Sequence, residues 1–454
     1  MFKFLKGLRN KINSSYWLRA GSYSLLNKIL TTLFAFVNFY ILVRLLPKSD
    51  FGAYVLFFSV ANFLELIKHG FIRNPLIHFL ANTQNDSRQV QTASVYLNTI
   101  IGLLEVGLLL LCSLYLGNFW SVPIINQLFL IYILSTLALV PVNHLDVVQQ
   151  ARMEFKGTFM SNVTRHGSFF LYILVYFISD RKIHLTSLIY ANFFSIVLSG
   201  FVSYFFARKF LLLSRVVDRE WIVKLFHYGK FTFGTNISST IMKNIDSWML
   251  GKLISPVAVA IFNPAIRISN LVEVPTDTLT TILFPKLSKK AAEEGTGAAR
   301  YLYEKSVGTI TAIMFPMIIL VILLADPIVR IIVGDGFSET VPILRVTMLY
   351  GLIIPFNRFL GIVLDATGNA RTNFRFVLRN ALINIVSNYI FIHQFGIIGA
   401  AYGTLTTYTI ALIYNQVYLH KKFGVKISGV FEQVFMFYKD IFAIGKQIIQ
   451  KRIK

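Results

Sequence analysis

The chain has 454 residues, of which 55% are hydrophobic and 14% charged, and its 44 Lys and Arg against 21 Asp and Glu give a net charge of +23. Soluble domains carry about 25% charged residues, so this composition excludes an ordinary soluble protein and predicts an integral membrane protein. A single cysteine, Cys112, excludes a disulfide framework and a cysteine-based zinc site.

Apolar runs long enough to cross a bilayer predict about twelve transmembrane helices, and hence an all-α membrane protein with little chain left for a soluble catalytic domain. The first run follows several basic residues but has no small-residue cleavage site, so we expect a retained helix rather than a signal peptide. The predicted helices cover residues 18–45, 51–80, 90–116, 122–148, 158–178, 184–207, 225–251, 256–285, 306–325, 340–366, 373–394 and 397–420.

The residues after the last predicted helix, 421–454, intersperse apolar and aromatic side chains with charged ones. This pattern is typical of an amphipathic helix that lies at the membrane surface. We therefore expect a basic cytoplasmic tail in which this helix lies along the membrane. A short additional span is the alternative.

The distribution of basic residues predicts the orientation of the chain. With the N-terminus in the cytoplasm, the cytoplasmic segments hold 26 Lys and Arg and the outer loops hold 5. Basic residues concentrate on the cytoplasmic side of membrane proteins, so both termini and the polar segments 208–224 and 286–305 are expected to be cytoplasmic. The positive charge then reflects topology and attraction to anionic lipid, not binding of nucleic acid.

The two halves of the chain repeat each other. The aligned pairs are Glu65 and Glu273 at an offset of 208, and Pro141 and Pro355, Asn143 and Asn357, and Arg165 and Arg379 at an offset of 214. Two halves of six helices each have the same orientation in the membrane. We therefore predict an N-terminal lobe at 1–207, a cytoplasmic linker at 208–224, a C-terminal lobe at 225–420 and the tail at 421–454, with a central cavity between the lobes.

Four motifs carry a resemblance to a known family: RLLPKSDFGAY at 44–54, NIDSWMLG at 244–251, FPKLS at 284–288 and FGIIGAAYGT at 395–404. Through them the chain resembles the polysaccharide (O-antigen, Wzx-type) flippases of the multidrug/oligosaccharidyl-lipid/polysaccharide exporter superfamily. The resemblance covers essentially the whole chain and implies a two-lobed fold. It also implies transport of an undecaprenyl-diphosphate-linked glycan from the cytoplasmic to the outer leaflet of a bacterial inner membrane, for cell-surface polysaccharide biosynthesis.

The resemblance further implies partners: the lipid-linked oligosaccharide, the membrane lipids, and the glycosyltransferases and polysaccharide polymerase that act before and after transport. The chain has no nucleotide-binding or catalytic motif, so we expect a transporter rather than an enzyme. No cofactor or metal is predicted. A gradient of H⁺ or Na⁺, or the membrane potential, would then drive transport.

The predicted helices contain 13 Lys and Arg against 7 Asp and Glu. Ionisable groups inside a membrane should face a partner or a water-filled cavity. Six cations lie near predicted helix ends, where their heads can reach the membrane surface. They are Arg19, Arg44, Lys68, Arg73, Arg345 and Arg375.

Cations nearer the middle of the helices are candidates for binding a diphosphate, which suits the forked donors of arginine. They are Lys28, Arg165, Arg267 and Arg379, with Lys243 and Arg358 as further candidates. Lys243 could instead be neutralised by Asp246, and Arg358 by Asp365. The acids Glu65, Asp246 and Glu273 are candidates for coupling transport to a cation, or they could be structural partners of other polar groups.

Two rival functions remain open. A multidrug or organic-cation exporter of the same superfamily should present acids to its substrate, whereas here bases outnumber acids. A multispan transferase or ligase for polyprenyl-linked glycans would need catalytic residues on a sizeable outer loop, and the longest predicted outer segment, about 326–339, is too short to hold a site alone.

Overall fold

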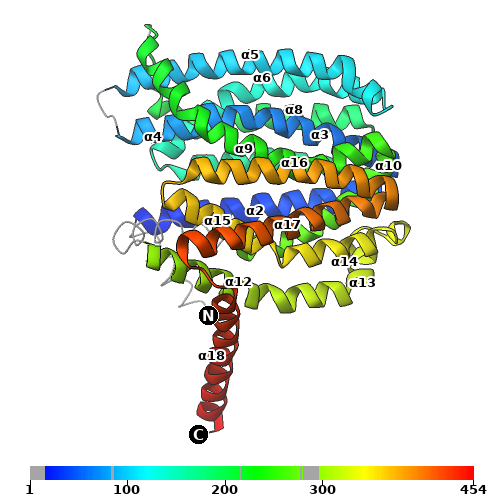
Figure 1. The fold of residues 1–454 in the computed structure, drawn as a ribbon. Helices are drawn as coiled ribbons and strands as arrows, with labels where there is room; N and C mark the ends of the chain where they lie inside the picture. The colour runs from blue at the N-terminus through cyan, green and yellow to red at the C-terminus, as the bar shows by residue number, and fades with distance from the viewer. Residues whose placement is uncertain (1–15, 83–85, 215, 277–278, 280–295, 454) are drawn as a thin grey trace. The chain divides into compact units, whose positions relative to one another are not determined.

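The computed structural model describes residues 16–82, 86–214, 216–276, 279 and 296–453 (Figure 1). These residues are almost entirely helical and contain no strand, which confirms the predicted all-α fold. Within them, seven helices are long and apolar enough to cross a membrane, or eight if the bent pair α14 and α15 forms one span. The count of twelve spans stays a prediction.

Contacts within the chain divide it into two compact units, Met1–Thr240 and Ile241–Lys454. The elements that begin in the first unit are α2 (Tyr16–Leu45), α3 (Lys48–Lys68), the π-helical turn η1 (His69–Arg73), α4 (Asn74–Asn82), α5 (Ser87–Phe119), α6 (Ile124–Ala151), α7 (Phe155–Ile178), α8 (Leu185–Ala207), the 3₁₀ turn η2 (Arg208–Phe210) and α9 (Arg219–Leu253). Helix α9 continues into the second unit.

The second unit follows with α10 (Pro256–Val272), α12 (Thr296–Leu323), α13 (Ala325–Ile332), the 3₁₀ turn η3 (Asp335–Phe337), α14 (Thr340–Gly351), α15 (Ile354–Ala366), α16 (Ala370–Phe395), α17 (Ile397–Phe423) and α18 (Ile427–Ile453). The FPKLS motif at 284–288 and much of the predicted cytoplasmic segment 286–305 lie outside the described residues.

Neighbour relations between helices recur in the two units. In the first unit α5 packs on α6, α6 packs on α8, and α7 packs on α8. In the second unit α12 packs on α14 and α15, both of these pack on α17, and α16 packs on α17. The internal repeat seen in the sequence is therefore a repeat of helix packing.

The division between the units lies inside α9 rather than in the predicted linker 208–224. Trp221 and Leu225, at the start of α9, are buried in one hydrophobic core with Phe71 and Leu76. A cytoplasmic linker at 208–224 stays a prediction, and within that range the first turn of α9 contributes to the core of the first unit.

Two predicted helices are irregular, the first by a π-helical turn within a continuous helix and the second by a bend. The run predicted at 51–80 is α3, η1 and α4, and the run predicted at 340–366 is α14 and α15, bent by 40°. Pro355 lies in the first turn of α15. Backbone N–H groups in a first turn have no acceptor within the helix, so the missing N–H of proline costs nothing there, and its ring favours the start of a new helix. The outer segment predicted at about 326–339 contains most of α13 and all of η3.

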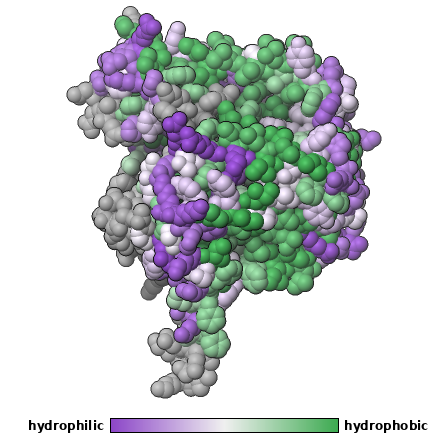
Figure 2. All heavy atoms as spheres, in the orientation of Figure 1, coloured by the Kyte–Doolittle hydropathy of each residue, from purple (hydrophilic) through white to green (hydrophobic). Residues whose placement is uncertain are grey.

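Large apolar side chains cover the outer faces of many helices, and much of the surface in Figure 2 is hydrophobic. On α5, Leu103, Leu104 and Leu114 are 60–63% exposed. Soluble proteins rarely expose contiguous apolar surface on this scale. Lipid contact accounts for it, in agreement with a multi-span membrane protein.

The glycines of the FGIIGAAYGT motif allow α16 and α17 to lie close together. A Cβ at Gly399 would collide with the backbone of Phe391, and one at Gly403 with Asn388. The motif therefore marks a close contact between the two helices, because only glycine leaves the space that this contact requires.

The predicted tail helix is α18. Gly424, at a φ of 68°, ends α17 before it. The Tyr438 hydroxyl donates to the Ala312 carbonyl oxygen of α12 at 2.6 Å, while Phe435 and Phe442 are 73% and 77% exposed. The helix itself is confirmed, and its position at the membrane surface stays a prediction.

Candidate functional site

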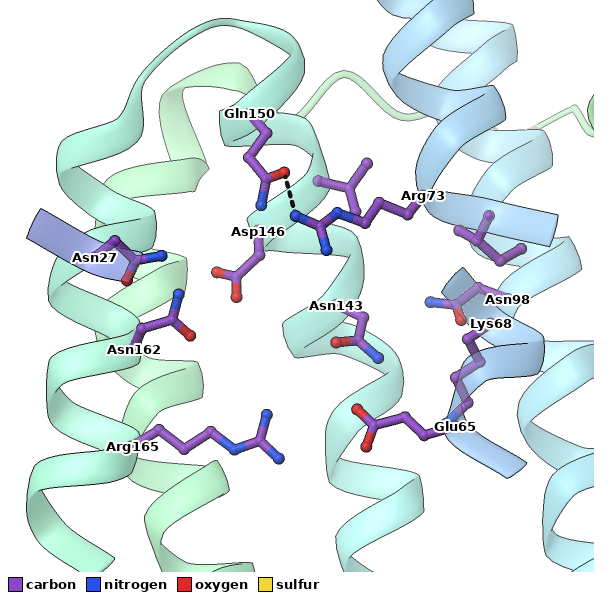
Figure 3. A pocket seen from close by; sticks show the side chains of 12 residues that line it. Asn27, Glu65, Lys68, Arg73, Asn98, Asn143, Asp146, Gln150, Asn162 and Arg165 are labelled. Carbon is purple, nitrogen blue, oxygen red and sulfur yellow. Dashed lines mark hydrogen bonds between the residues drawn. The ribbon is translucent and has the colours of Figure 1, made fainter. Parts of the chain in front are cut away.

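A polar cavity of about 150 Å³ lies within the first unit (Figure 3). Three cations, two carboxylates and five amides line it together with two aliphatic side chains. They are Lys68, Arg73 and Arg165; Glu65 and Asp146; Asn27, Asn98, Asn143, Gln150 and Asn162; and Ile72 and Val147. The cavity is surrounded by α2, α3, η1, α5, α6 and α7.

The π-helical turn η1 brings two of these cations to the same cavity. In an α-helix, residues five apart point about 140° away from each other. The wider turn at His69–Arg73 follows an i to i+5 pattern, which places residues five apart on nearly the same face. Lys68 and Arg73 both line the cavity for this reason.

Lys68 forms a buried ion pair with Glu105 of α5. The Nζ and Oε2 atoms are 2.6 Å apart, and the side chains are 2% and 1% exposed. Lys68 Nζ also lies 3.5 Å from the Thr136 carbonyl oxygen. The prediction that Lys68 reaches the membrane surface is wrong, because the chain continues through η1 and α4 and leaves Lys68 packed against α5 and α6.

Arg165 and Glu65 extend toward each other from opposite sides of the cavity in Figure 3. Within the described part of the chain, neither makes a hydrogen bond or an ion pair. By contrast, Arg73 donates to Gln150 Oε1 at 3.0 Å, and Asp146 Oδ1 accepts from the Ser203 hydroxyl at 2.6 Å. Arg165 is thus the cavity cation that is available to a ligand without breaking an existing bond.

The amides add unpaired hydrogen-bonding groups. Asn27 Oδ1, Asn98 Oδ1 and Asn143 Nδ2 are buried and have no partner among the described residues. Asn98 is fixed by its other end, since Nδ2 donates to the Val140 carbonyl oxygen at 2.8 Å. Buried polar atoms normally have partners, so the cavity is suited to a polar ligand or ordered water.

Of the six predicted substrate-binding cations, Arg165 alone is in this cavity. Lys28, Lys243, Arg267 and Arg358 have exposed side chains, with Arg267 Nε 3.4 Å from Asn263 Oδ1. A role for these four at a cavity shared by the two units stays a prediction.

Arg379, the repeat partner of Arg165, is held by its own unit. Its Nη2 donates to Asn380 Oδ1 at 2.9 Å and to Asn415 Oδ1 at 3.1 Å. The guanidinium carbon lies 3.8 Å from the ring centroid of Tyr414. These contacts fix the side chain between α16 and α17.

The coupling candidates have different surroundings. Asp246 is buried and accepts hydrogen bonds from Asn388 Nδ2 and from the Thr404 hydroxyl, the latter at 2.9 Å, and it makes no ion pair with Lys243. Glu65 lines the cavity, and Glu273 caps the C-terminus of α10. Their coupling role stays a prediction.

The other expected pair also does not form, since Asp365 accepts from Asn373 Nδ2 at 3.0 Å rather than pairing with Arg358. Among the described residues, no three His, Cys, Asp or Glu side chains lie close enough together to hold a metal ion.

The sequence interpretation missed the second half of the cavity, namely Lys68, Arg73, Asp146 and the amides. It also missed Glu105. The available signal was Glu105 itself, which stands alone in a long apolar run of α5 and therefore requires a partner. The sequence alone could not show that Lys68 supplies it.

Residues 41–342 match the model of a family described as polysaccharide biosynthesis protein. The chain belongs to this family. The resemblance identified from the four motifs is thereby confirmed.

Curated relatives of the chain include proteins named for the biosynthesis of cell-surface glycans. The chain is 23% identical over 295 residues to the teichuronic acid biosynthesis protein TuaB of Bacillus subtilis, covering 63% of this chain and 59% of that protein. It is 19% identical over 204 residues to a probable low-salt glycan biosynthesis flippase of Haloferax volcanii, covering 45% and 43%. The chain thus matches about half the length of these relatives.

Solved structures share the fold. The lipid II flippase MurJ in an inward closed conformation superposes with a TM-score of 0.72 at 13% identity, covering 94% of this chain and 92% of that one. An inward-facing multidrug resistance transporter of the MATE family gives a TM-score of 0.72 at 15% identity, covering 87% and 94%. At these identities the likeness concerns the fold alone.

Proposed function

We propose that this member of the polysaccharide biosynthesis family is a flippase. Its cargo is a glycan linked to a polyprenyl diphosphate, undecaprenyl diphosphate in a bacterium, which it moves from the cytoplasmic to the outer leaflet of the inner membrane. The observation that carries the proposal is the polar cavity of the first unit, into which the Arg165 side chain extends without a hydrogen-bond or ionic partner among the described residues. The names of the relatives support it.

The chemistry of the cavity suits a phosphorylated headgroup. A diphosphate offers several charged acceptor oxygens, and guanidinium groups bind such oxygens through forked pairs of N–H donors. Arg165 and Arg73 supply forked donors, and Lys68 supplies a compact positive charge between the amides. The amide groups suit the hydroxyls of an attached sugar.

The lipid tail is expected to remain outside the cavity. Removing it from the bilayer would cost about 0.8 kcal/mol for each CH₂ group. The headgroup would therefore pass through the protein while the tail stays in lipid, and the repeated units would open alternately to the two sides. Neither nucleotide nor metal is part of this proposal, and H⁺, Na⁺ or the membrane potential supplies the energy.

The proposal is tested with the purified full-length chain in liposomes that contain a fluorescent undecaprenyl-diphosphate-linked oligosaccharide. A membrane-impermeant quencher reports how much lipid changes leaflet. We expect Arg165→Gln to slow translocation by at least about tenfold, because charged hydrogen bonds to the cargo are lost. Arg181→Gln, in an exposed turn after α7, is the matched control and should keep the wild-type rate.

A second candidate, an exporter of organic cations, is favoured by one observation. Glu65 and Asp146 place two carboxylates in the same cavity, and such groups attract cations. The same liposomes loaded with ethidium distinguish the two functions. Gradient-driven ethidium transport without translocation of the lipid-linked glycan would contradict the flippase and support the exporter.

A further inference from the structure

The ion pair between Lys68 and Glu105 lies at the wall of the cavity. Lys68 lines the cavity, whereas Glu105 lies behind it and is 1% exposed. Lys68 Nζ is the group that neutralises Glu105 Oε2, and Glu105 Oε1 has no partner in the described part of the chain. Any ligand that draws Lys68 into the cavity removes the counter-ion of a buried carboxylate.

Among the residues that the structure describes, Glu105 contacts no cation other than Lys68. The charged and titratable groups that face this region are Glu65 and Lys68 on α3, Arg73 on η1, Tyr132 and Asp146 on α6, and Arg165 on α7. Among the described residues Lys68 is the one of these that pairs with Glu105. Asp146 differs, because its Oδ1 accepts from the Ser203 hydroxyl, which does not line the cavity.

We propose that Lys68 exchanges Glu105 for the diphosphate when the headgroup binds, and that Glu105 then takes up a proton. This inference rests on the proposed function, and it assigns proton coupling to a residue outside the predicted set of Glu65, Asp246 and Glu273. A buried carboxylate without a counter-ion is strongly unfavourable, and protonation removes its charge.

The exchange conserves atoms and charge. The Lys68 ammonium keeps its three protons and moves its ionic contact from Glu105 Oε2 to a diphosphate oxygen. One proton from water forms an O–H bond at Glu105. No covalent bond to carbon or phosphorus changes. When the headgroup leaves, Lys68 returns to Glu105 and the proton is released.

Calorimetry of inorganic pyrophosphate binding to the full-length protein tests this directly. Titrations at one pH in buffers of different ionisation enthalpy give the number of protons taken up for each pyrophosphate bound. We expect wild type to take up about one proton more than Glu105→Gln, because only wild type has the Glu105 carboxylate to protonate. Any proton taken up by pyrophosphate itself is the same for both proteins and cancels in the comparison. Glu154→Gln, which removes an acid outside the cavity, is the control and should keep the wild-type number. Glu65→Gln and Asp146→Asn test whether another acid of the cavity takes up the proton instead.

Glu105→Gln leaves Lys68 buried without its counter-ion, so the double variant Lys68→Gln, Glu105→Gln is measured as well. This neutral pair has similar volume, and we expect it to lack the extra proton. Equal proton numbers in wild type and the double variant would overturn the exchange, as would loss of the proton in Glu65→Gln. A wild type that binds no pyrophosphate contradicts the proposed function and the exchange together, whereas binding with equal proton numbers contradicts the exchange alone.

Discussion

Arg165 and Arg379 occupy related positions in helices α7 and α16 of the two repeated units, but their surroundings differ. Arg379 is tied to Asn380 and Asn415 and lies over the ring of Tyr414. Arg165 extends into the cavity and has no hydrogen-bond or ionic partner among the described residues (Figure 3). One arginine therefore joins two helices, while its repeat partner is available to a ligand.

The acids of the two units show the same contrast. Asp246 is buried and receives hydrogen bonds from α16 and α17. Asp146 receives one from Ser203 and also lines the cavity. Two units with the same helix packing thus use charge differently, and sequence repetition by itself does not show which copy has the binding role.

Lys68 lines the cavity and also forms a buried ion pair with Glu105, so Lys68→Ala should have the largest effect on stability. It leaves Glu105 buried without a counter-ion, which typically costs about 3–5 kcal/mol. The free energy of unfolding, measured by denaturant titration in detergent, checks this value.

The control for this prediction is Lys209→Ala, which removes the exposed partner of Glu154 at 3.6 Å. Exposed pairs contribute about 0–1 kcal/mol. If the two variants lose the same stability, then Lys68 and Glu105 are not paired in the membrane-like environment, and the exchange between Glu105 and a diphosphate has no basis.

The helical fold was predictable because apolar runs of membrane-spanning length leave few alternatives. Each predicted range overlaps a helix or a bent set of helices. What the runs could not show is where a helix is interrupted. Pro141 lies within the continuous helix α6, whereas its repeat partner Pro355 begins α15 after a bend, so the same residue type gives opposite outcomes in the two units.

The site was predictable only in part. Depth along a helix and sequence repetition identified Arg165 and Glu65, which do line the cavity. The same criteria also selected Lys28 and Arg267, whose side chains are exposed in their units. The face of a helix that a side chain occupies depends on local winding, and the π-helical turn η1, which aligns Lys68 with Arg73, has no recognisable signal in the sequence.

Removing the hydroxyl group that donates to each acid, from Thr404 in one unit and from Ser203 in the other, sharpens the comparison between the units. Thr404→Val takes a donor from the buried Asp246, and we expect a loss of about 1.5–3 kcal/mol in the free energy of unfolding, as for hydrogen bonds to charged groups. Ser203→Ala takes the donor from Asp146, where water in the cavity can replace it, and an acceptor from Gln149 Nε2, which keeps the Leu145 carbonyl oxygen. We therefore expect about 0.5–1 kcal/mol. A larger loss for Ser203→Ala would show that the first unit, too, uses its acid to hold helices together.

A small expected effect on stability separates the two arginines. Arg379→Gln loses the hydrogen bond to Asn415 and the contact with the Tyr414 ring, and should lower the free energy of unfolding by about 1 kcal/mol. Arg165→Gln breaks no such bond among the described residues, so its stability should match wild type while translocation of the lipid-linked glycan slows. The free energy of unfolding and the translocation rate are measured for both variants. Loss of a structural arginine mainly lowers stability, whereas loss of a cargo-binding arginine mainly lowers the transport rate. If Arg165→Gln were the less stable variant and transported at the normal rate, the assignment of the cavity as the cargo site would be wrong.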